Sequence, residues 1–365
     1  MNRNYLLIIS LLTFSLSSCN STDPAPSQPY DNGVIVLNAG NFLDNNGSIS
    51  LVQRTSTTAS YDIFQKENNR TLAGSLSGYA EVNEKGIILV DNSTAGKDGI
   101  EIVDARTFKS LASIPSSELE NPRAVVKATD TKAYITCWDA TGDFSNFYKN
   151  PGYVAILDLT TNKLTKKILV QNGAESILVI GNEAFVGNTG SGVTKITVID
   201  IATDAVKQSI EVGQNPDLVG LDANNKLWLY AGGEMVRLNT QTKTVETRFK
   251  ITSPNASKSP SSFTLSADKK TIYFTNSFYD AADGYLQKGE TYSFAINAAA
   301  VVADKPFINR LFSGGLGVDP QTGVIYAGLV PSFKQAGYVL RYQPNGTLID
   351  SVKAEIAPST FFFKK

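Results

Sequence analysis

The first residue with a predictable chemistry is Cys19, one of only two cysteines in the chain. It follows an apolar run over residues 6–16 and the small pair Ser17-Ser18. An aliphatic residue, two small residues and a cysteine form the pattern that bacterial signal peptidase II cleaves, which leaves the thiol for acylation. The run is too short for a permanent membrane span and follows the basic residue Arg3. We therefore predict a signal peptide over residues 1–18 and lipidation at Cys19; an ordinary secretory signal with an incidental cysteine is the alternative.

The segment after the cysteine is predicted to be a flexible tether. Residues 20–29 carry Ser, Thr, Asp and three prolines, which bury too little apolar surface to fold. Acyl chains on a cysteine hold a protein firmly at a membrane, because each buried CH₂ contributes about 0.8 kcal/mol. We expect a lipidated tether over residues 19–32 and one folded domain over residues 33–365. The anchor alone leaves the inner membrane, the periplasmic leaflet and the cell surface open.

The most informative absence is that of histidine, of which the chain has none. This excludes Ser-His-Asp and Cys-His catalysis, imidazole proton shuttles and typical zinc or copper sites. Carboxylate chemistry and calcium binding remain. A net charge of −1 without basic clusters argues against nucleic-acid binding. With Cys19 assigned to lipid, no intrachain disulfide can form, so stability must come from the apolar core.

Strand-like runs begin at Gly33 and recur along the whole chain. Runs rich in Val, Ile, Tyr and Phe alternate with Gly, Asn, Asp and Pro, and no long helical periodicity appears. A strand that ends in Asp or Asn before a Thr-rich turn recurs seven times, most clearly at 99–104, 153–162 and 196–203. A turn and an aromatic-rich strand precede these copies, as at 181–186. The spacing of about 40 to 50 residues indicates units of about four strands each.

The repeat predicts an all-β fold with a single β-propeller of seven four-stranded blades. One such unit cannot bury both faces of its sheet alone, so the units must pack around an axis. The first strand, 34–38, matches the second strand of a repeat, and the last, 359–363, matches the first. We expect strand 34–38 to complete the C-terminal blade and remove its open edge. A pair of β-sandwich domains is the alternative.

Two resemblances extend this prediction. Ile196 to Thr203 and Asn215-Pro216-Asp217 resemble the repeats of YncE-like (YVTN-repeat) β-propellers, a likeness that implies the fold and no single function. The lipobox, the tether, the strand Gly33 to Phe42 and the following Asn46 to Ser50 resemble Bacteroidota lipoprotein propellers of the BtuG type. The BtuG-type resemblance implies an outer-membrane lipoprotein, on the cell surface or the periplasmic face, that captures cobalamin for a TonB-dependent transporter. Without histidine, no protein imidazole could hold the cobalt.

The candidate binding residues lie in loops expected on one rim of the propeller. Two of these loops, 138–152 and 276–289, are long and aromatic, and exposed aromatic rings reduce solubility unless they pack or bind. A second set of loops is expected to bring arginines and the carboxylates Glu175 and Asp217 to the mouth of the central channel. The predicted ligand-binding residues are Phe42, Trp138, Phe144, Phe147, Tyr148, Phe278, Tyr279, Tyr285, Phe333, Arg70, Arg123 and Arg310. The alternative is that the rings cap their own blades and the charges form ion pairs.

These residues favour a binding protein over an enzyme. An aromatic rim with a polar floor suits a large amphipathic ligand or a protein surface. We therefore expect small-molecule binding with no catalytic residues, no cofactor and no resident metal. Two alternatives stay open: a protein-protein interaction scaffold of the envelope, and a calcium-dependent propeller lyase or lactonase. A carboxylate cluster of Asp280, Asp283 and Glu290 is the candidate calcium site, although its spacing is not that of an EF-hand.

Overall fold

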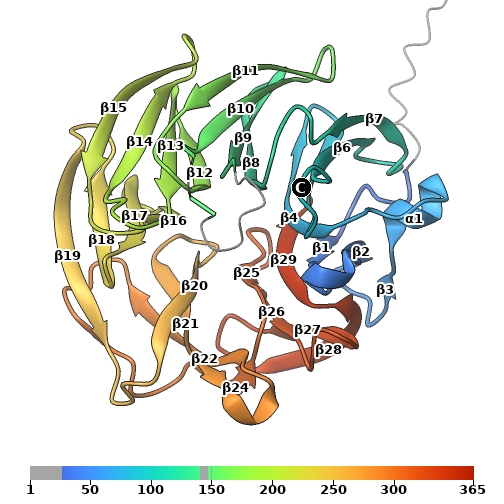
Figure 1. Ribbon diagram of the computed structural model, residues 1–365. Coiled ribbons are helices and arrows are strands. Elements are labelled where there is room, and N and C mark those ends of the chain that lie inside the picture. Colours follow the sequence, from blue (N-terminus) through green and yellow to red (C-terminus); the bar gives the residue numbers. More distant parts are fainter. Residues whose placement is uncertain (1–26, 140–146, 149) are drawn as a thin grey trace, which may run out of the picture.

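Seven β-sheets stand around a common axis and form a β-propeller (Figure 1). The computed structural model describes residues 27–139, 147–148 and 150–365. In each sheet, or blade, four strands run antiparallel and follow one another from the axis outwards. The predicted all-β propeller of seven blades is therefore confirmed.

We number the blades from the one that holds the N-terminal strand. The strands of each blade are given from the axis outwards. Blade 1 consists of β29 (Pro358–Phe363), β1 (Val34–Asn38), β2 (Ser48–Val52) and β3 (Ala59–Ser60), and blade 2 of β4 (Ser75–Val82), β5 (Lys85–Asp91), β6 (Gly99–Asp104) and β7 (Ser110–Pro115). Blade 3 consists of β8 (Pro122–Thr129), β9 (Lys132–Cys137), β10 (Tyr153–Asp158) and β11 (Lys163–Leu169), and blade 4 of β12 (Ala174–Ile180), β13 (Glu183–Asn188), β14 (Lys195–Asp200) and β15 (Ala205–Glu211).

Blades 5 to 7 follow the same order. Blade 5 consists of β16 (Asp217–Leu221), β17 (Lys226–Ala231), β18 (Glu234–Asn239), β19 (Thr244–Thr252) and β23 (Val301–Val302). Blade 6 consists of β20 (Ser259–Leu265), β21 (Thr271–Asp280), β22 (Leu286–Ala295) and β24 (Ile308–Phe312), and blade 7 of β25 (Leu316–Val318), β26 (Ile325–Leu329), β27 (Ala336–Tyr342) and β28 (Leu348–Ile356). The described helical segments are α1 (Ile63–Asn68), η1 (Phe42–Asp44) and η2 (Ala281–Asp283).

The central strands are buried on both faces because every blade packs between two neighbours. In β5, Ile88 packs into the core shared with blade 1, whereas Ile87 and Leu89 pack into the core shared with blade 3. Successive side chains of a strand point to opposite faces, so burial on both sides requires a continuous apolar run. One such apolar cluster joins each neighbouring pair of blades around the ring.

The ring is closed by the two ends of the folded chain. β1 pairs antiparallel with β29, with Val34 opposite Phe363, so one blade contains both termini of the propeller. Lys364 then crosses to blade 2, where its buried ammonium group donates to Glu81 and to the carbonyl oxygen of Ala105. The predicted role of strand 34–38 is confirmed. The closure joins the last strand, β29, to the first two strands, β1 and β2, in one blade.

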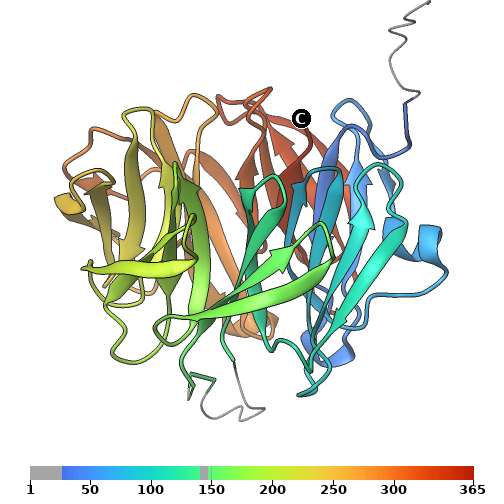
Figure 2. The same ribbon diagram turned by 90° about the horizontal axis from the view of Figure 1, so that it is seen from above.

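The connections between strands separate onto two faces of the ring (Figure 2). Connections from second to third strands, and from each blade to the next, make the loop face; the remaining turns make the turn face. The N-terminal segment joins the turn face, where Tyr30 is buried with its ring centroid 5.3 Å from that of Phe108. Asp31 also accepts hydrogen bonds from Arg106 at 2.8 and 3.0 Å. The chain therefore enters the propeller on the face opposite to the long loops.

Two blades depart from the four-strand pattern. In blade 5, β23 comes from the connection between β22 and β24 and pairs in parallel with β19, which straps blade 6 to blade 5. In blade 1, the outer strand β3 has only two residues, and α1 follows it. The sequence repeat did not predict either departure, because both lie at outer edges where the strand pattern is weakest.

We expect ring closure to dominate stability. Removing residues 358–365 would expose the buried edge of β1 and take away Phe361, Phe362 and Phe363, which pack against the cores on both sides of blade 1. Burying one large apolar side chain contributes about 1.5–3 kcal/mol, so we expect the unfolding free energy to fall by about 3 kcal/mol or more. Urea unfolding followed by circular dichroism measures this. Removal of the exposed Lys365 alone is the control, and equal stability of the two truncated chains would contradict the prediction.

Candidate functional site

The long loop of blade 3 places a cluster of aromatic rings on the loop face. The Trp138 ring centroid lies 5.1 Å from that of Tyr148, edge to face, and 6.0 Å from that of Phe147. All three side chains are half-buried. They therefore pack against one another while keeping part of each residue open to solvent. The rings thus combine packing on their own blade with surface that a ligand can reach, the two roles that the sequence left open.

Tyr148 carries the cluster across to blade 4. Asn172, in the connection to blade 4, donates to the Tyr148 carbonyl oxygen at 2.6 Å. A Cβ atom at Gly173 would lie 2.0 Å from the carbonyl oxygen of Thr189 and 2.9 Å from Cδ1 of Tyr148. Gly173 also has a φ of +62°, which glycine adopts without steric cost. The close approach of the two blades at this point thus depends on glycine.

Arg123, near the start of the inner strand β8, connects the aromatic cluster to two carboxylates. Its Nη1 donates to Asp91 at 2.9 Å, and its Nη2 donates to Glu175 at 3.3 Å. Its guanidinium carbon lies 4.1 Å from the Trp138 ring centroid, a cation–π distance. Trp138 Nε1 in turn donates to Glu175 at 2.7 Å. We call Asp91, Arg123, Trp138 and Glu175 the Arg123 cluster; it joins blades 2, 3 and 4.

Carboxyl groups outnumber arginine at this part of the loop face. Burial raises the pKa of Asp91 to about 6, with Arg123 opposing the shift and Asp98 adding to it. Burial also raises the pKa of Glu120 to about 7, and the hydrogen bond with Asp98 adds to the effect. The sequence did not single out Asp91, Asp98 or Glu120, because nothing local distinguishes them from other acidic residues in turns. The result is a group of carboxyl groups, Asp91, Asp98 and Glu120, beside the Arg123 cluster.

Asp217, the first residue of inner strand β16, extends this acidic surface toward blade 5. Its side chain is open to solvent, yet the protein around it raises the pKa of its carboxyl group, and a hydrogen bond with Ser176 opposes that rise. Ser176 Oγ also accepts from the Leu218 backbone N–H at 3.0 Å. Glu175 and Asp217, which the sequence predicted in loops at the channel mouth, lie at the starts of the neighbouring inner strands β12 and β16, and both carry oxygen atoms that accept hydrogen bonds.

A second group of rings covers the loops of blades 6, 7 and 1. A small apolar cluster of Leu286, Val330, Ala357, Ala39 and Ile356 packs the loops of these three blades together. Around it stand exposed apolar side chains from the same loops, which we call the aromatic arc: Phe42, Leu43, Tyr279, Tyr285 and Phe333. Tyr279 and Tyr285 are 68% and 69% exposed, far more than a ring that caps its own blade. Leu43 was missed because sequence reasoning looked for aromatic residues alone.

The loop predicted over 276–289 is largely a β-hairpin. β21 continues to Asp280 and β22 starts at Leu286, so only residues 281–285 form the tip. Phe278 lies within this hairpin, half-buried, with the Lys258 ammonium group 5.4 Å from its ring centroid. The Phe-Tyr-Asp segment that suggested a loop thus pairs with β22 as a regular strand extension.

Two predicted arginines lie away from the propeller axis, and the expectation that they reach the mouth was wrong. Arg310 is an exposed residue of β24, the outer strand of blade 6. Arg70 follows α1 on the outer side of the ring and pairs with Glu101 at 2.8 Å. Arg123 alone of the three lies beside the axis, on an inner strand. Phe144 and Cys19 lie outside the described residues.

The three carboxylates predicted as a calcium cluster do not converge. Asp280 and Asp283 both accept from Lys288, at 3.1 and 2.5 Å, whereas Glu290 pairs with Lys258 at 2.7 Å. Each carboxylate therefore has an ammonium partner in place of a shared cation. In the described part of the chain, no group of three or more acidic or cysteine side chains is placed to hold a metal ion.

The fold and the loop face define a seven-bladed propeller with an acidic and aromatic side-chain cluster over blades 2 to 4 and an exposed aromatic arc over blades 6, 7 and 1. The chain belongs to the family described as a domain of unknown function (DUF5074), which matches residues 32–364. No curated protein matches the chain at a significant level. Over the described residues, no helix is both long and apolar enough to cross a membrane.

Solved structures share the propeller at low sequence identity. A quinonprotein alcohol dehydrogenase-like protein from Bacteroides thetaiotaomicron is 16% identical, with a TM-score of 0.65 over 92% of this chain and 79% of the other. A functionally unknown protein from Desulfotomaculum acetoxidans is 12% identical, with a TM-score of 0.57 over 91% and 98%. Hydrazine synthase from Kuenenia stuttgartiensis is 15% identical, with a TM-score of 0.54 over 78% and 88%. At these identities the likeness concerns the fold alone.

The carboxyl groups of Asp91 and Glu120 give the stability an unusual pH dependence. Without histidine, the groups that titrate between pH 8 and pH 6 include Asp91 and Glu120, whose pKa values in the folded state are about 6 and about 7. Their unfolded values are about 3.9 and about 4.3, so acidification protonates the folded state first and stabilises it. We expect the Tm to rise from pH 8 to pH 6, by about 1–2 °C for each kcal/mol gained in a domain of this size.

Calorimetric scans of matched variants test this assignment. The double variant Asp91→Asn/Glu120→Gln should lose most of the rise. Asp268→Asn is the control, because hydrogen bonds from Ser266 and the Lys270 backbone lower the pKa of Asp268, which stays ionised throughout this range. An unchanged rise in the double variant would show that other groups titrate here.

Proposed function

We propose that this protein is a lipid-anchored binding protein of the bacterial envelope that captures a large amphipathic nutrient on its loop face, with a corrinoid such as cobalamin as the best candidate. The observation that carries the proposal is the division of one face into two halves. One half accepts hydrogen bonds through Glu175 and Asp217, and the other presents open apolar surface.

The chemistry of a corrinoid suits such a face. Its macrocycle is broad and carries carboxamide groups around the periphery, which donate hydrogen bonds. The oxygens of Glu175 and Asp217 accept them, and the rings of the aromatic arc contact the apolar parts of the ligand. Since the chain lacks histidine, no imidazole of the protein would take part in holding the cobalt, and recognition must come from the edges of the ligand.

The BtuG-type resemblance supports the same role and adds a partner. A TonB-dependent outer-membrane transporter would receive the ligand, and lipid on Cys19 would keep the propeller at the membrane. We propose capture without turnover. Lysine partners already occupy the three carboxylates considered for calcium, which favours binding over a calcium-dependent lyase or lactonase.

A protein-protein scaffold is the second candidate function. The observation that favours it is the exposure of Leu43, Tyr279 and Tyr285 in the loops of blades 1 and 6, since exposed apolar side chains on one face mark an interaction site. In that case the aromatic arc would bind a protein in the absence of any small ligand.

Calorimetric titration with cyanocobalamin separates these functions. The mature chain with Cys19→Ser should bind saturably and leave the ligand unchanged. Glu175→Gln should weaken binding by about tenfold, because a hydrogen bond to a charged group contributes about 1.5–3 kcal/mol. Val206→Ala, at an exposed apolar residue of outer strand β15, is the matched control and should bind as the parent does. Absence of heat and of tryptophan quenching would refute corrinoid capture.

Lipidation gives an independent prediction. Cells that express the full chain should incorporate radiolabelled palmitate into the protein, and Cys19→Ala should abolish both incorporation and membrane association. Cys137→Ala is the control, because Cys137 is buried in β9 and is not available for modification. Incorporation that persists in Cys19→Ala would place the anchor elsewhere.

A further inference from the structure

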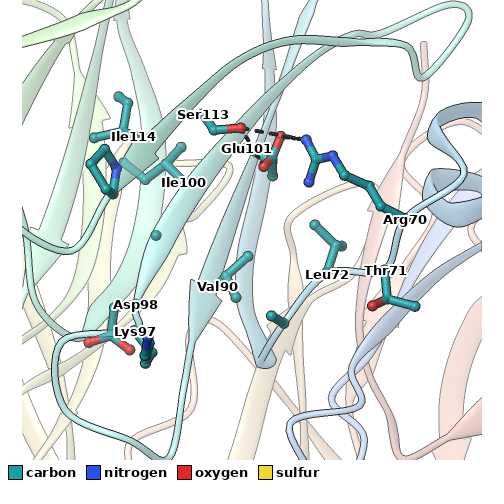
Figure 3. A pocket seen from close by; sticks show the side chains of 13 residues that line it. Arg70, Thr71, Leu72, Val90, Lys97, Asp98, Ile100, Glu101, Ser113 and Ile114 are labelled. Atoms are coloured by element: carbon teal, nitrogen blue, oxygen red, sulfur yellow. Dashed lines mark hydrogen bonds and ion pairs between the residues drawn. The ribbon is translucent and has the colours of Figure 1, made fainter.

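A groove of about 450 Å³ lies at the outer part of the ring, where blade 1 meets blade 2 (Figure 3). One wall is the connection 70–73 between α1 and β4, and the other is formed by β6 and β7 of blade 2. The outer strand β3 of blade 1 has only two residues, so it covers little of the neighbouring sheet. The groove is thus a consequence of the short outer strand.

The floor of the groove is aliphatic. It consists of side chains that the fold already buries at 1–6% exposure: Leu72, Val90, Ile100 and Ile114. They come from the connection, from β5, from β6 and from β7. Apolar side chains from four segments therefore line one continuous trough, which favours an unbranched hydrocarbon chain over a bulky polar ligand.

The charged residues of the groove are not equally available to a ligand. Glu101 accepts from Ser113 at 2.6 Å, from Arg70 at 2.8 Å and from Ser110 at 3.2 Å. Asp98 accepts from the backbone N–H groups of Asn92 and Asn121, both at 2.7 Å. Both carboxylates are therefore occupied by groups of the protein itself.

Two cations remain at the ends of the trough. Figure 3 shows Arg70 and Lys97 at opposite ends, with Leu72, Val90 and Ile100 between them. Lys97 is exposed, and within the described residues it forms no ion pair. Lys97 is therefore a cation of the groove whose charge no described carboxylate neutralises.

Arg70 is the better placed of the two to hold an anion. Its Nη2 donates to Glu101 and Ser110, and its guanidinium carbon lies 4.8 Å from the Phe64 ring centroid, so the side chain is fixed in position. Its side chain is nevertheless 45% exposed. Among the described residues, neither its Nε nor its Nη1 donates a hydrogen bond to the protein. A carboxylate can accept a charge-assisted hydrogen bond from one of these two donors, which point to opposite sides of the guanidinium.

We propose that this groove binds an aliphatic monocarboxylate, with the carboxylate on Arg70 and the hydrocarbon chain along the floor toward Lys97. The groove lies on the outer side of the ring, whereas Glu175 and Asp217 lie on inner strands. The site is therefore separate from the one proposed for the corrinoid and does not depend on it.

Calorimetric titration with hexanoate, octanoate and decanoate below their micellar concentrations tests the floor. Each additional CH₂ is worth at most about a fourfold gain in affinity if it is buried, so decanoate should bind most tightly by a wide margin. Decanol should bind at least tenfold more weakly than decanoate. Equal affinities along the series, or equal binding of decanol, would overturn the proposal.

Variants test the placement of the head group and the chain. Arg70→Gln should weaken decanoate binding at least tenfold, whereas Arg310→Gln, at an exposed arginine on an outer strand, should leave it unchanged. Ala73→Trp should block the groove without altering a core residue, since Ala73 is exposed and lines it. Thermal unfolding of each variant verifies that the fold persists. A loss in Lys97→Ala with none in Arg70→Gln would reverse the proposed orientation, and undiminished binding in Ala73→Trp would refute the site.

Discussion

The structure depends on one constraint: each blade is apolar on both faces and must be covered by two neighbours. Ile87 and Ile88 of β5 belong to different cores, so neither core exists without the blade on its own side. Such an arrangement is stable only as a closed ring, which explains why β29 and β1 come from opposite ends of the chain. It also explains how a domain without a disulfide holds together, because the apolar contacts are shared around the whole circle.

The loop face takes its properties from that ring. Arg123 and Glu175 lie near the starts of inner strands of adjacent blades, so rigid sheets fix the distance between them, and Asp91 completes the contact from blade 2. The aromatic arc rests instead on apolar packing among loop residues such as Leu286 and Val330. A polar half built on strands and an apolar half built on loops differ in rigidity. The first is suited to fixed hydrogen-bond geometry, and the second to contacts that adapt to shape.

The sequence predicts what is repeated and misses what occurs once. The strand pattern identifies the seven units and the closing strand, because Val34 to Asn38 carries the continuous apolar run of a second strand without a first. The hydrogen bonds of Asp158 and Asp200 to the Thr-rich turns after them are likewise local. The contacts of Arg123 with Asp91 and Glu175 span 32 and 52 residues, and no local pattern encodes them. Arg70 and Arg310 were misplaced for a related reason: the short β3 and the strap β23 alter the outer edges of the blades, and repeat counting assumes regular ones.

The position of β1 has a mechanical consequence. The chain that leads to Cys19 continues directly into β1, which lies between β29 and β2 with five paired residues toward β2. A force on the tether would act along β1 and load its hydrogen bonds on both sides in shear, so that many must break together. A tether attached to an outer strand would instead peel that strand away one bond at a time. Tyr30 and Asp31 meet the load before it reaches the sheet, since both are fastened to blade 2. The proposed lipid on Cys19 would thus pull on a strand that is paired on both sides.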